Sequence, residues 1–270
     1  MDYLALPVQL KNRYAEPRMA NRYLQLGNER ASRVEALFNA IAPRYDLIND
    51  LQSLGLHRRW KRQLVRRARL RSGETALDVC CGTGDIAFAL CGADTRVLAV
   101  DFSAAMLDRA TRRKPGLNRT CRDRPTLLFV RGDALRLPVP DESVDVVTIG
   151  YGLRNLADLD QAAREFHRVT RAGGRLLILD FGKPTSPFWR TLYFAYLRLV
   201  VPLFGKVFCG DADSYGYILE SLMQYPAQSG VGGLLRNAGW VDADTTDILG
   251  GMMSLSIARK PDLANAGRTS

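Results

Sequence analysis

Residues 77–85 read Leu-Asp-Val-Cys-Cys-Gly-Thr-Gly-Asp, at the point where a short apolar run gives way to a helical pattern. The two glycines of this run predict a tight turn, since a side chain there would hold a ligand away from the backbone and resist positive φ. Dinucleotide-binding enzymes use a similar turn, G-x-G-x-x-G, to wrap a pyrophosphate at a helix N-terminus. Here Ala87 stands where the third glycine would be. The run therefore predicts a strand, a ligand-binding turn and a helix, and the neighbouring residues must identify the ligand.

Apolar segments of strand length alternate with helical patterns on the C-terminal side of this turn. After a first strand over 75–79, the pattern predicts strands over 96–100, 127–130, 144–149 and 175–179, and a helix over 158–170. A helix over 227–238 and two strands over 240–246 and 252–258 follow a helical insert. Such alternation is typical of a parallel sheet with helices on both faces, so we expect a doubly wound α/β fold.

The length of 270 residues suits one large α/β domain with added segments. We expect an N-terminal arm over 1–32, a single domain over 33–260 and a tail over 261–270. Within the domain, cap helices occupy 33–70, and the helical insert occupies about 186–226.

Two carboxylates flank the glycine turn. Asp78 precedes it, and Asp85 stands at the helix start, where a dinucleotide enzyme would hold its pyrophosphate. Carboxylates so placed would repel a diphosphate, whereas they suit a ligand that carries a positive sulfonium and an ammonium group. Together with Gly82, Thr83 and Gly84, they are the first candidate cofactor-binding residues.

Further candidates follow the next strands. Asp101 comes 23 positions after Asp78 (101 − 78), where it can accept hydrogen bonds from both hydroxyls of a ribose. Asp133, followed by Ala134, stands after the third strand, where a carboxylate can accept the amino group of an adenine. Phe102 and Gly150 complete the candidate cofactor-binding set. The competing interpretation, that these are ordinary strand-end caps and turns, stays open for each residue alone.

Metal binding and disulfide bonding find little support in the sequence. The five cysteines, at 80, 81, 91, 121 and 209, form no CxxC pair, and the two histidines, His57 and His167, are far apart. We therefore expect no metal site, and a reducing, cytoplasmic environment.

The net charge of +10 leaves the partner open. Basic clusters at 57–62, 66–67 and 112–114 are compatible with nucleic acid, with an anionic membrane leaflet, or with solvated helix faces. The first thirty residues lack a continuous apolar core, so no secretory signal is predicted. The most apolar stretch, 188–208, contains Arg190 and Arg198, and Pro202 is expected to break it. We interpret it as an amphipathic or buried segment rather than a membrane span.

Several longer stretches carry a family resemblance. The order of turn, ribose acid and adenine acid resembles the class I S-adenosylmethionine-dependent methyltransferases. The stretches 38–50, 54–60, 150–156 and 211–226 look like signatures of the ubiquinone and menaquinone biosynthesis C-methyltransferases. The chain departs from many relatives at Cys80 and Cys81, where glycines are frequent, and at Gly150, where a serine is frequent. The resemblance covers roughly residues 33 to 260.

The resemblance implies a seven-stranded, mostly parallel sheet with a reversed final hairpin, and S-adenosylmethionine as cofactor. It also implies C-methylation of a polyprenyl quinol, the substrate partner. Carbon is a poor nucleophile until the neighbouring hydroxyl loses its proton, so the site must stabilise a phenolate. Arg154 could hold that oxygen, Asn155 could orient the ring or a water, and Tyr45 could close over the site. His57 ranks lower as a base. Competing interpretations are an ion pair at a helix cap for Arg154, core packing for Tyr45 and a structural role for His57.

The sequence leaves the head group and the partners open. Residues 250–253 look closer to the phylloquinone-type branch of the family, which favours a naphthoquinol. Demethylmenaquinol is therefore the favoured substrate, and a 2-polyprenyl-6-methoxy-benzoquinol is the alternative. The basic charge keeps an RNA or protein methyltransferase in view, although no nucleic-acid partner is expected. An NAD-dependent oxidoreductase and a non-catalytic protein with the cofactor fold are the remaining alternatives. We also expect peripheral contact with an anionic membrane, with a lid packed on its own domain as the alternative for 188–208, and a homo-oligomer is compatible with the sequence.

Overall fold

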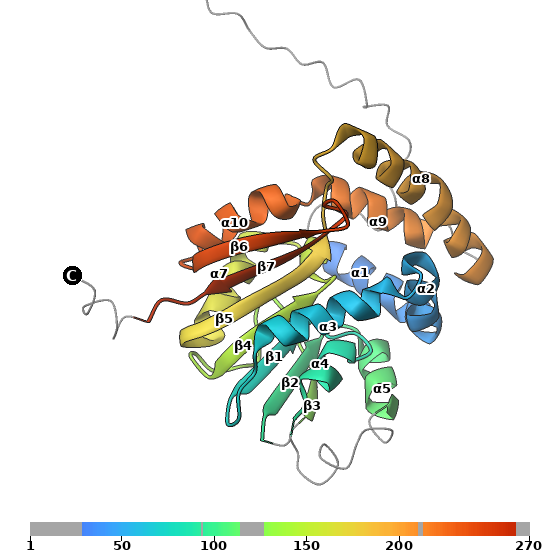
Figure 1. Cartoon of the computed structure of the whole chain (residues 1–270). Coiled ribbons are helices and arrows are strands. Elements are labelled where there is room, and N and C mark those ends of the chain that lie inside the picture. The colour runs from blue at the N-terminus through green and yellow to red at the C-terminus, as the bar shows by residue number, and fades with distance from the viewer. Residues whose placement is uncertain (1–28, 93, 114–126, 210–212, 263–270) are drawn as a thin grey trace, which may run out of the picture.

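The computed structural model describes residues 29–92, 94–113, 127–209 and 213–262. These residues form one seven-stranded sheet in the order β3-β2-β1-β4-β5-β7-β6 (Figure 1). The strands are β1 Thr75–Val79, β2 Arg96–Asp101, β3 Leu127–Arg131, β4 Val144–Gly150, β5 Thr170–Phe181, β6 Val241–Ile248 and β7 Met253–Arg259.

The sheet is parallel except at β7. Strand β1 pairs in parallel with both β2 and β4, and β4 pairs in parallel with β5. Strand β7 runs antiparallel to both β5 and β6, which confirms the predicted reversed hairpin. The strand order reverses between β1 and β4, and ligands of open α/β sheets bind beyond the carboxyl ends of the strands at such a point.

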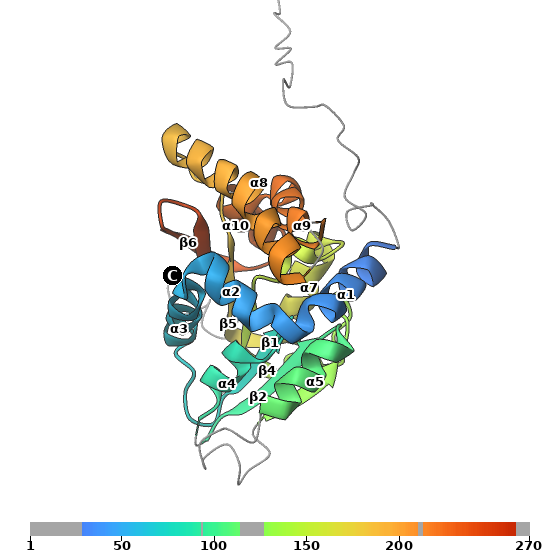
Figure 2. The same cartoon turned by 90° about the vertical axis from the view of Figure 1, so that its right-hand side faces the viewer.

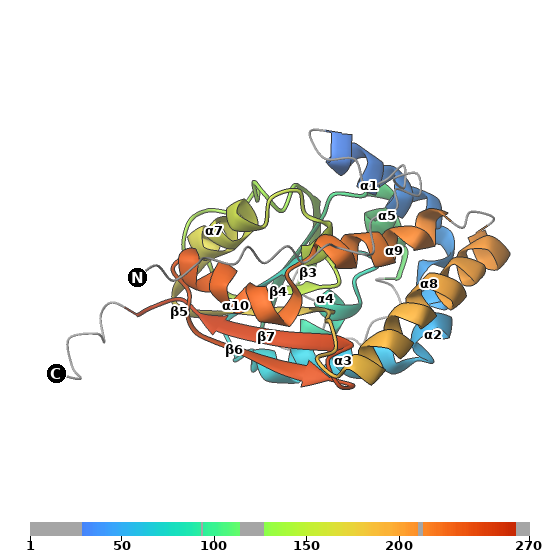
Figure 3. The ribbon, with the colours of Figure 1, turned by 90° about the horizontal axis from the view of Figure 1, so that it is seen from above.

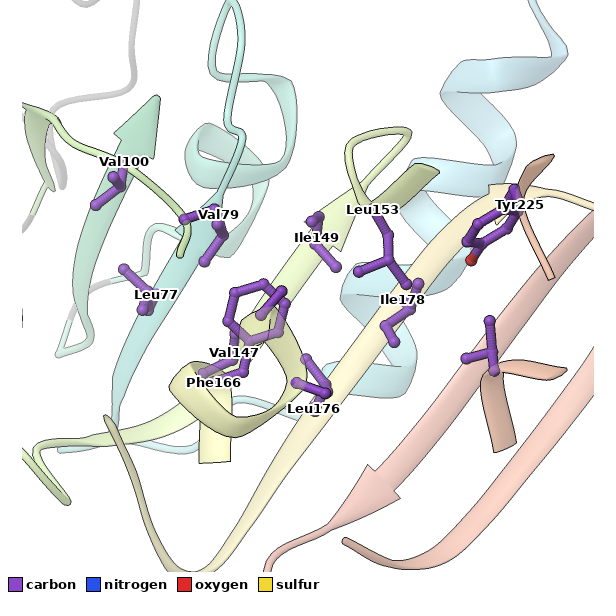
Figure 4. Packing of buried hydrophobic residues seen from close by; sticks show 14 of the residues in the cluster. Leu77, Val79, Val100, Val147, Ile149, Leu153, Phe166, Leu176, Ile178 and Tyr225 are labelled. Atoms are coloured by element: carbon purple, nitrogen blue, oxygen red, sulfur yellow. The ribbon is translucent and has the colours of Figure 1, made fainter. Parts of the chain in front are cut away.

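Helices cover both faces of the sheet, as Figures 1 and 3 show. One face packs against α3 (Leu56–Ala68) and α4 (Asp85–Leu90). The other packs against α7 (Leu159–Val169) and α10 (Ala227–Asn237). Helix α5 (Ala104–Arg113) contacts β3 and α1, and its Arg113 reaches Asp85 of α4. The alternation of strand side chains explains this arrangement, because Leu77 and Val79 enter one core and Ala76 enters the other. Figure 4 shows the core that contains Leu77.

A helical cap lies over the carboxyl ends of the strands. It consists of α1 (Glu29–Ile41), the short helix η1 (Ala42–Arg44), α2 (Tyr45–Ser53), α8 (Pro187–Cys209) and α9 (Asp213–Gln224). Figures 2 and 3 show α2 beside α8, and the two helices are in contact. Leu54 and Gly55 take left-handed backbone conformations, with φ of 50° and 74°, and so separate α2 from α3. The cap therefore brings segments from before β1 and from after β5 to the ligand-binding edge of the sheet.

Three boundaries differ from the sequence expectation. Helix α1 begins at Glu29, inside the predicted arm over 1–32, and β5 begins at Thr170, so that it includes Gly173 and Gly174. The expected break at Pro202 is wrong, since α8 continues through it. Proline removes the hydrogen bond to the carbonyl of Arg198, and because Arg198 is exposed, water can satisfy that carbonyl. Among the described helices, none has the length and apolar character needed to cross a membrane. The predicted arm (apart from its last residues) and most of the tail lie outside the described residues, as do positions 211 and 212 of the late signature.

Candidate active site

A cavity of about 120 Å³ lies at the carboxyl ends of β1, β2, β3 and β4. Six predicted cofactor-binding residues line it: Gly82, Asp101, Phe102, Asp133, Ala134 and Gly150. Two predicted catalytic residues, Tyr45 and Asn155, line it as well. The remaining lining comes mainly from α1, from the ends of the strands and from the segment after β4.

The glycine turn leaves backbone open to this cavity. Gly82 has φ of +54°, and a Cβ added there would meet only Tyr45 Cε1, at 3.9 Å. At Gly84, with φ of +86°, an added Cβ would lie 3.0 Å from Phe88 and 3.1 Å from Phe129. Gly82 therefore leaves room for a ligand, whereas Gly84 is needed for close packing behind the turn.

Asp101 ties the turn to the cavity. Its Oδ2 accepts a hydrogen bond from Gly82 N at 2.7 Å, and its Oδ1 accepts one from Ser103 N at 2.8 Å. Burial raises the pKa of Asp101, although its backbone hydrogen bonds oppose this. Each carboxylate oxygen can accept a second hydrogen bond, so the donors of a ribose diol fit this residue.

Asp133 and Asn155 offer further polar atoms. Asp133 Oδ1 accepts a hydrogen bond from Leu135 N at 2.9 Å, and the residue is exposed. Asn155 Oδ1 is buried without a hydrogen-bond partner in the described part of the chain. A buried acceptor without a donor carries a free-energy cost that a bound ligand can relieve. The cavity, the turn and these hydrogen-bond acceptors thus fit an adenosine-containing ligand.

Four predicted cofactor-binding residues do not line the cavity: Asp78, Thr83, Gly84 and Asp85. Asp85 accepts hydrogen bonds from Lys61 Nζ at 2.8 Å and Arg113 Nη2 at 2.7 Å. Burial alone would raise the pKa of Asp85, but these two cations lower it to about 2. Its carboxylate is therefore paired with two cations of the protein and is not available to a sulfonium.

Asp78 lies beneath the turn in the sheet. It is 1% exposed, and its Oδ1 accepts a hydrogen bond from Thr148 Oγ1 at 2.8 Å. Burial raises the pKa of Asp78 to about 7, against the opposing effect of that hydrogen bond. The expected attraction between this carboxylate and a sulfonium is therefore weakened near neutral pH, because much of the group is protonated there.

A second cavity, of about 570 Å³, adjoins the first. Leu, Ile, Val, Met and aromatic side chains from α1, α2, α3, α8 and the β6–β7 turn make up most of its lining. Phe38, Tyr45 and Tyr151 line both cavities. A ligand in the smaller cavity and a ligand in the larger cavity would therefore meet at these three rings.

Arg154 stands on the wall of the larger cavity. Its Nη1 donates to Asp180 Oδ1 at 2.8 Å and to the carbonyl of Tyr151 at 2.6 Å. Arg154 is 7% exposed and Asp180 is fully buried. Tyr151 has φ of 62°, a left-handed conformation that is uncommon for a residue with a side chain. The ion-pair interpretation of Arg154 is thus met, and the residue reaches the cavity as well.

Tyr45 begins α2 and lies opposite the glycine turn. Burial raises the pKa of Tyr45, while Lys61 acts in the opposite direction. Its phenol therefore stays protonated at neutral pH and can donate a hydrogen bond. The neighbouring Asp46 accepts a hydrogen bond from Thr83 Oγ1 at 2.7 Å, which fixes the start of α2 to the turn.

The cap supplies site residues that the sequence patterns did not single out. Val34, Glu35 and Phe38 of α1 line the smaller cavity, although only Phe38 falls in a quoted family stretch. His57 lines the larger cavity, where it is 4% exposed. Within the described ranges, no three His, Cys, Asp or Glu side chains gather as a metal ion would require.

Comparison with known proteins identifies the family. The model of the ubiE/COQ5 methyltransferase family matches residues 25–260. The chain belongs to this family. It is 38% identical over 240 residues to the ubiquinone/menaquinone biosynthesis C-methyltransferase UbiE of Cellvibrio japonicus, covering 86% of this chain and 93% of that one. It is 37% identical over 234 residues to the demethylmenaquinone methyltransferase of Paenarthrobacter aurescens, covering 87% and 88%. This ubiE/COQ5 family member is therefore a methyltransferase that uses S-adenosylmethionine.

Solved structures share the fold of this family member. A SAM-dependent methyltransferase from Aquifex aeolicus has a TM-score of 0.53 at 19% identity, covering 74% of this chain and 88% of that one. A SAM-dependent methyltransferase from Thermotoga maritima has a TM-score of 0.57 at 18% identity, covering 83% and 99%. These likenesses agree with the seven-stranded sheet and its reversed hairpin.

Proposed function

We propose that this methyltransferase transfers a methyl group to a ring carbon of a polyprenyl quinol. The main support is the apolar cavity of about 570 Å³, which adjoins the smaller cavity at Phe38, Tyr45 and Tyr151. Volumes of this size are typical of small-molecule sites. A quinol ring at the shared wall would have the cofactor on one side and space for its prenyl tail on the other.

The cofactor would be held by the residues around the smaller cavity. Asp101 would accept hydrogen bonds from the ribose hydroxyls. Asp133 and the backbone near Ala134 would contact the adenine. Gly82 and Gly150 would lie beside the amino-acid chain of the cofactor. When bound, S-adenosylmethionine supplies an electrophilic methyl group on a positively charged sulfur. The protein need not activate that group, and its contribution is to align the acceptor carbon with it.

Activation of the ring carbon is the task of the residues at the shared wall. Loss of the hydroxyl proton makes the neighbouring carbon nucleophilic, and the resulting phenolate must be stabilised. Arg154 supplies a permanent cation at the cavity wall, where Asp180 fixes its position. Tyr45 can donate a hydrogen bond to the same oxygen, and Asn155 can orient the ring or a water molecule.

The prenyl tail would lie along α8 within the larger cavity. Leu197 and Val201 are buried there, whereas Leu192 and Val200 line the cavity and are also exposed. The exposed lining gives a long tail a route from the cavity to the surface. A naphthoquinol is the favoured head group and a benzoquinol the alternative.

We further propose that α8 contacts an anionic membrane without spanning it. Phe188 is 72% exposed and Leu199 is 70% exposed, and Arg190 and Arg198 are exposed on the same helix. Exposed apolar side chains with nearby arginines suit the boundary between head groups and acyl chains. The test is co-sedimentation with anionic liposomes. Failure to co-sediment, together with turnover of a long-tailed quinol without liposomes, would refute the contact.

The methyl acceptor can be identified in one assay. The enzyme and S-adenosylmethionine are incubated with reduced demethylmenaquinone or with the demethyl benzoquinol, and mass spectrometry reports which quinol gains a methyl group. We expect methylation of the naphthoquinol. Methylation of the benzoquinol alone would change the head group, and methylation of neither would contradict the proposed function.

A further inference from the structure

Some polar side chains that line the larger cavity have atoms without a hydrogen-bond partner among the described residues. Tyr196 Oη donates to the carbonyl of Gln52 at 2.7 Å, and Tyr193 Oη donates to the carbonyl of Met252 at 3.2 Å. In the described part of the chain, however, Gln52 Nε2, His57 Nδ1 and Tyr151 Oη are buried and lack hydrogen-bond partners. All three residues line the cavity. Buried polar groups without partners are rare, so these atoms point to a ligand with complementary oxygens.

His57 differs from the other two because its tautomer is fixed. Its Nε2 lies 2.8 Å from Asp50 Oδ1. Arg58 donates to both oxygens of Asp50, at 2.7 and 2.5 Å, and these hydrogen bonds hold the pKa of Asp50 well below its usual range. An ionised carboxylate only accepts, so Nε2 carries the ring proton. Burial lowers the pKa of His57, which keeps the ring neutral at pH 7. Nδ1 therefore carries no proton, and it can accept a hydrogen bond from a ligand.

We propose that His57 makes the cavity selective for the reduced form of the substrate. Its Nδ1 accepts a hydrogen bond from a quinol hydroxyl, which an oxidised quinone cannot give. This inference rests on the proposed function. Gln52 Nε2 and Tyr151 Oη can donate to an oxygen in either redox state, so they bind both forms. A quinone carbonyl beside Nδ1 would bring two acceptors together, and both would lose hydrogen bonding on burial.

Such selectivity has a chemical purpose. The quinol ring is electron-rich and can attack an electrophilic methyl group once a hydroxyl loses its proton. The quinone ring is electron-poor and cannot. A cavity that bound both forms equally would be blocked by the oxidised form wherever that form is abundant.

Two substitutions separate the roles of the two ring nitrogens. His57→Gln keeps a donor near the position of Nε2, so it can retain the Asp50 contact, but it lacks an atom at Nδ1. His57→Asn places its amide oxygen near the position of Nδ1 and cannot reach Asp50. We therefore expect His57→Gln to be the more stable variant and His57→Asn to be the more selective one. A purely structural histidine would give no such reversal.

The experiment measures redox preference without turnover. The full chain, loaded with S-adenosylhomocysteine, is incubated without oxygen with equal amounts of a geranyl 1,4-naphthoquinol and the matching quinone. The protein-bound fraction is separated and chromatography quantifies the two forms. We expect the wild type and His57→Asn to enrich the quinol at least tenfold and His57→Gln to bind the two forms within about threefold of each other.

Equal binding of the two forms by the wild type, or an unchanged preference in His57→Gln, overturns the role of His57 and leaves the quinol assignment intact. If the wild type binds neither form, and the methylation assay also gives no product, the proposed function fails and this inference fails with it.

Discussion

Arg154 connects the acceptor cavity to the buried Asp180, and the two roles can be separated by substitution. Arg154→Ala leaves the Asp180 charge buried and unpaired, which we expect to lower the free energy of unfolding by about 3 to 5 kcal/mol. Arg154→Lys keeps a cation but loses the planar fork, so it should retain more stability. We predict that both variants lose most turnover and keep their affinity for S-adenosylhomocysteine, as steady-state kinetics and calorimetry would show. Normal turnover in Arg154→Lys would show that the planar guanidinium group of Arg154 is not needed for methyl transfer.

Asp78 predicts a pH dependence of stability. Burial raises its pKa to about 7 in the folded protein, above the ordinary aspartate pKa of 3.8 that is expected in the unfolded chain. The folded state thus binds the proton more tightly, and the stabilisation present below pH 4 is lost as pH rises through about 7. Asp78→Asn resembles the protonated form. We predict that denaturant unfolding of this variant loses less stability than the wild type between pH 5 and pH 8. Parallel pH curves would contradict the buried-acid account.

At the level of helices and strands, polar pairs fix α1, α2 and α3 to the segments around the cofactor cavity. Asp46 of α2 accepts from Thr83 in the turn, Lys61 of α3 contacts Asp85 at 2.8 Å, and Glu35 of α1 contacts Arg131 at 2.8 Å. These contacts hold Tyr45 over Gly82. The cap and the turn therefore form one binding unit.

The contact between Asp46 and Thr83 can be tested with a matched pair of variants. Thr83→Val keeps the shape but removes the hydroxyl, and Thr83→Ser keeps the hydroxyl. We predict that Thr83→Val releases S-adenosylhomocysteine several-fold faster in stopped-flow measurements, because the start of α2 is held less firmly. Thr83→Ser should stay near the wild-type rate. Equal rates in all three proteins would show that this contact does not control cofactor release.

At the scale of the whole molecule, local patterns account for the part of the structure that sequence predicted. The strand before Gly82 and the reversed final hairpin follow from local apolar runs and from the family resemblance. The placement of Asp85 was not predictable in this way, because its partners Lys61 and Arg113 are 24 and 28 positions distant. The buried pairing of His57 with Asp50 likewise depends on how α2 and α3 pack. Helix α8, which continues through Pro202, packs against α9 and α2, and these contacts between distant segments were not visible in the sequence either.

We propose that the cavity beside the glycine turn binds S-adenosylmethionine through Asp101, and every other proposed role at the site depends on this binding. The decisive measurement is calorimetric titration of S-adenosylhomocysteine into the full chain, with Asp101→Asn as the comparison. We predict saturable binding of one ligand per chain, weakened at least tenfold in Asp101→Asn, since an amide nitrogen cannot accept a ribose hydroxyl. Absence of binding heat in the well-folded wild type across several temperatures, or equal affinity in the variant, would contradict the account.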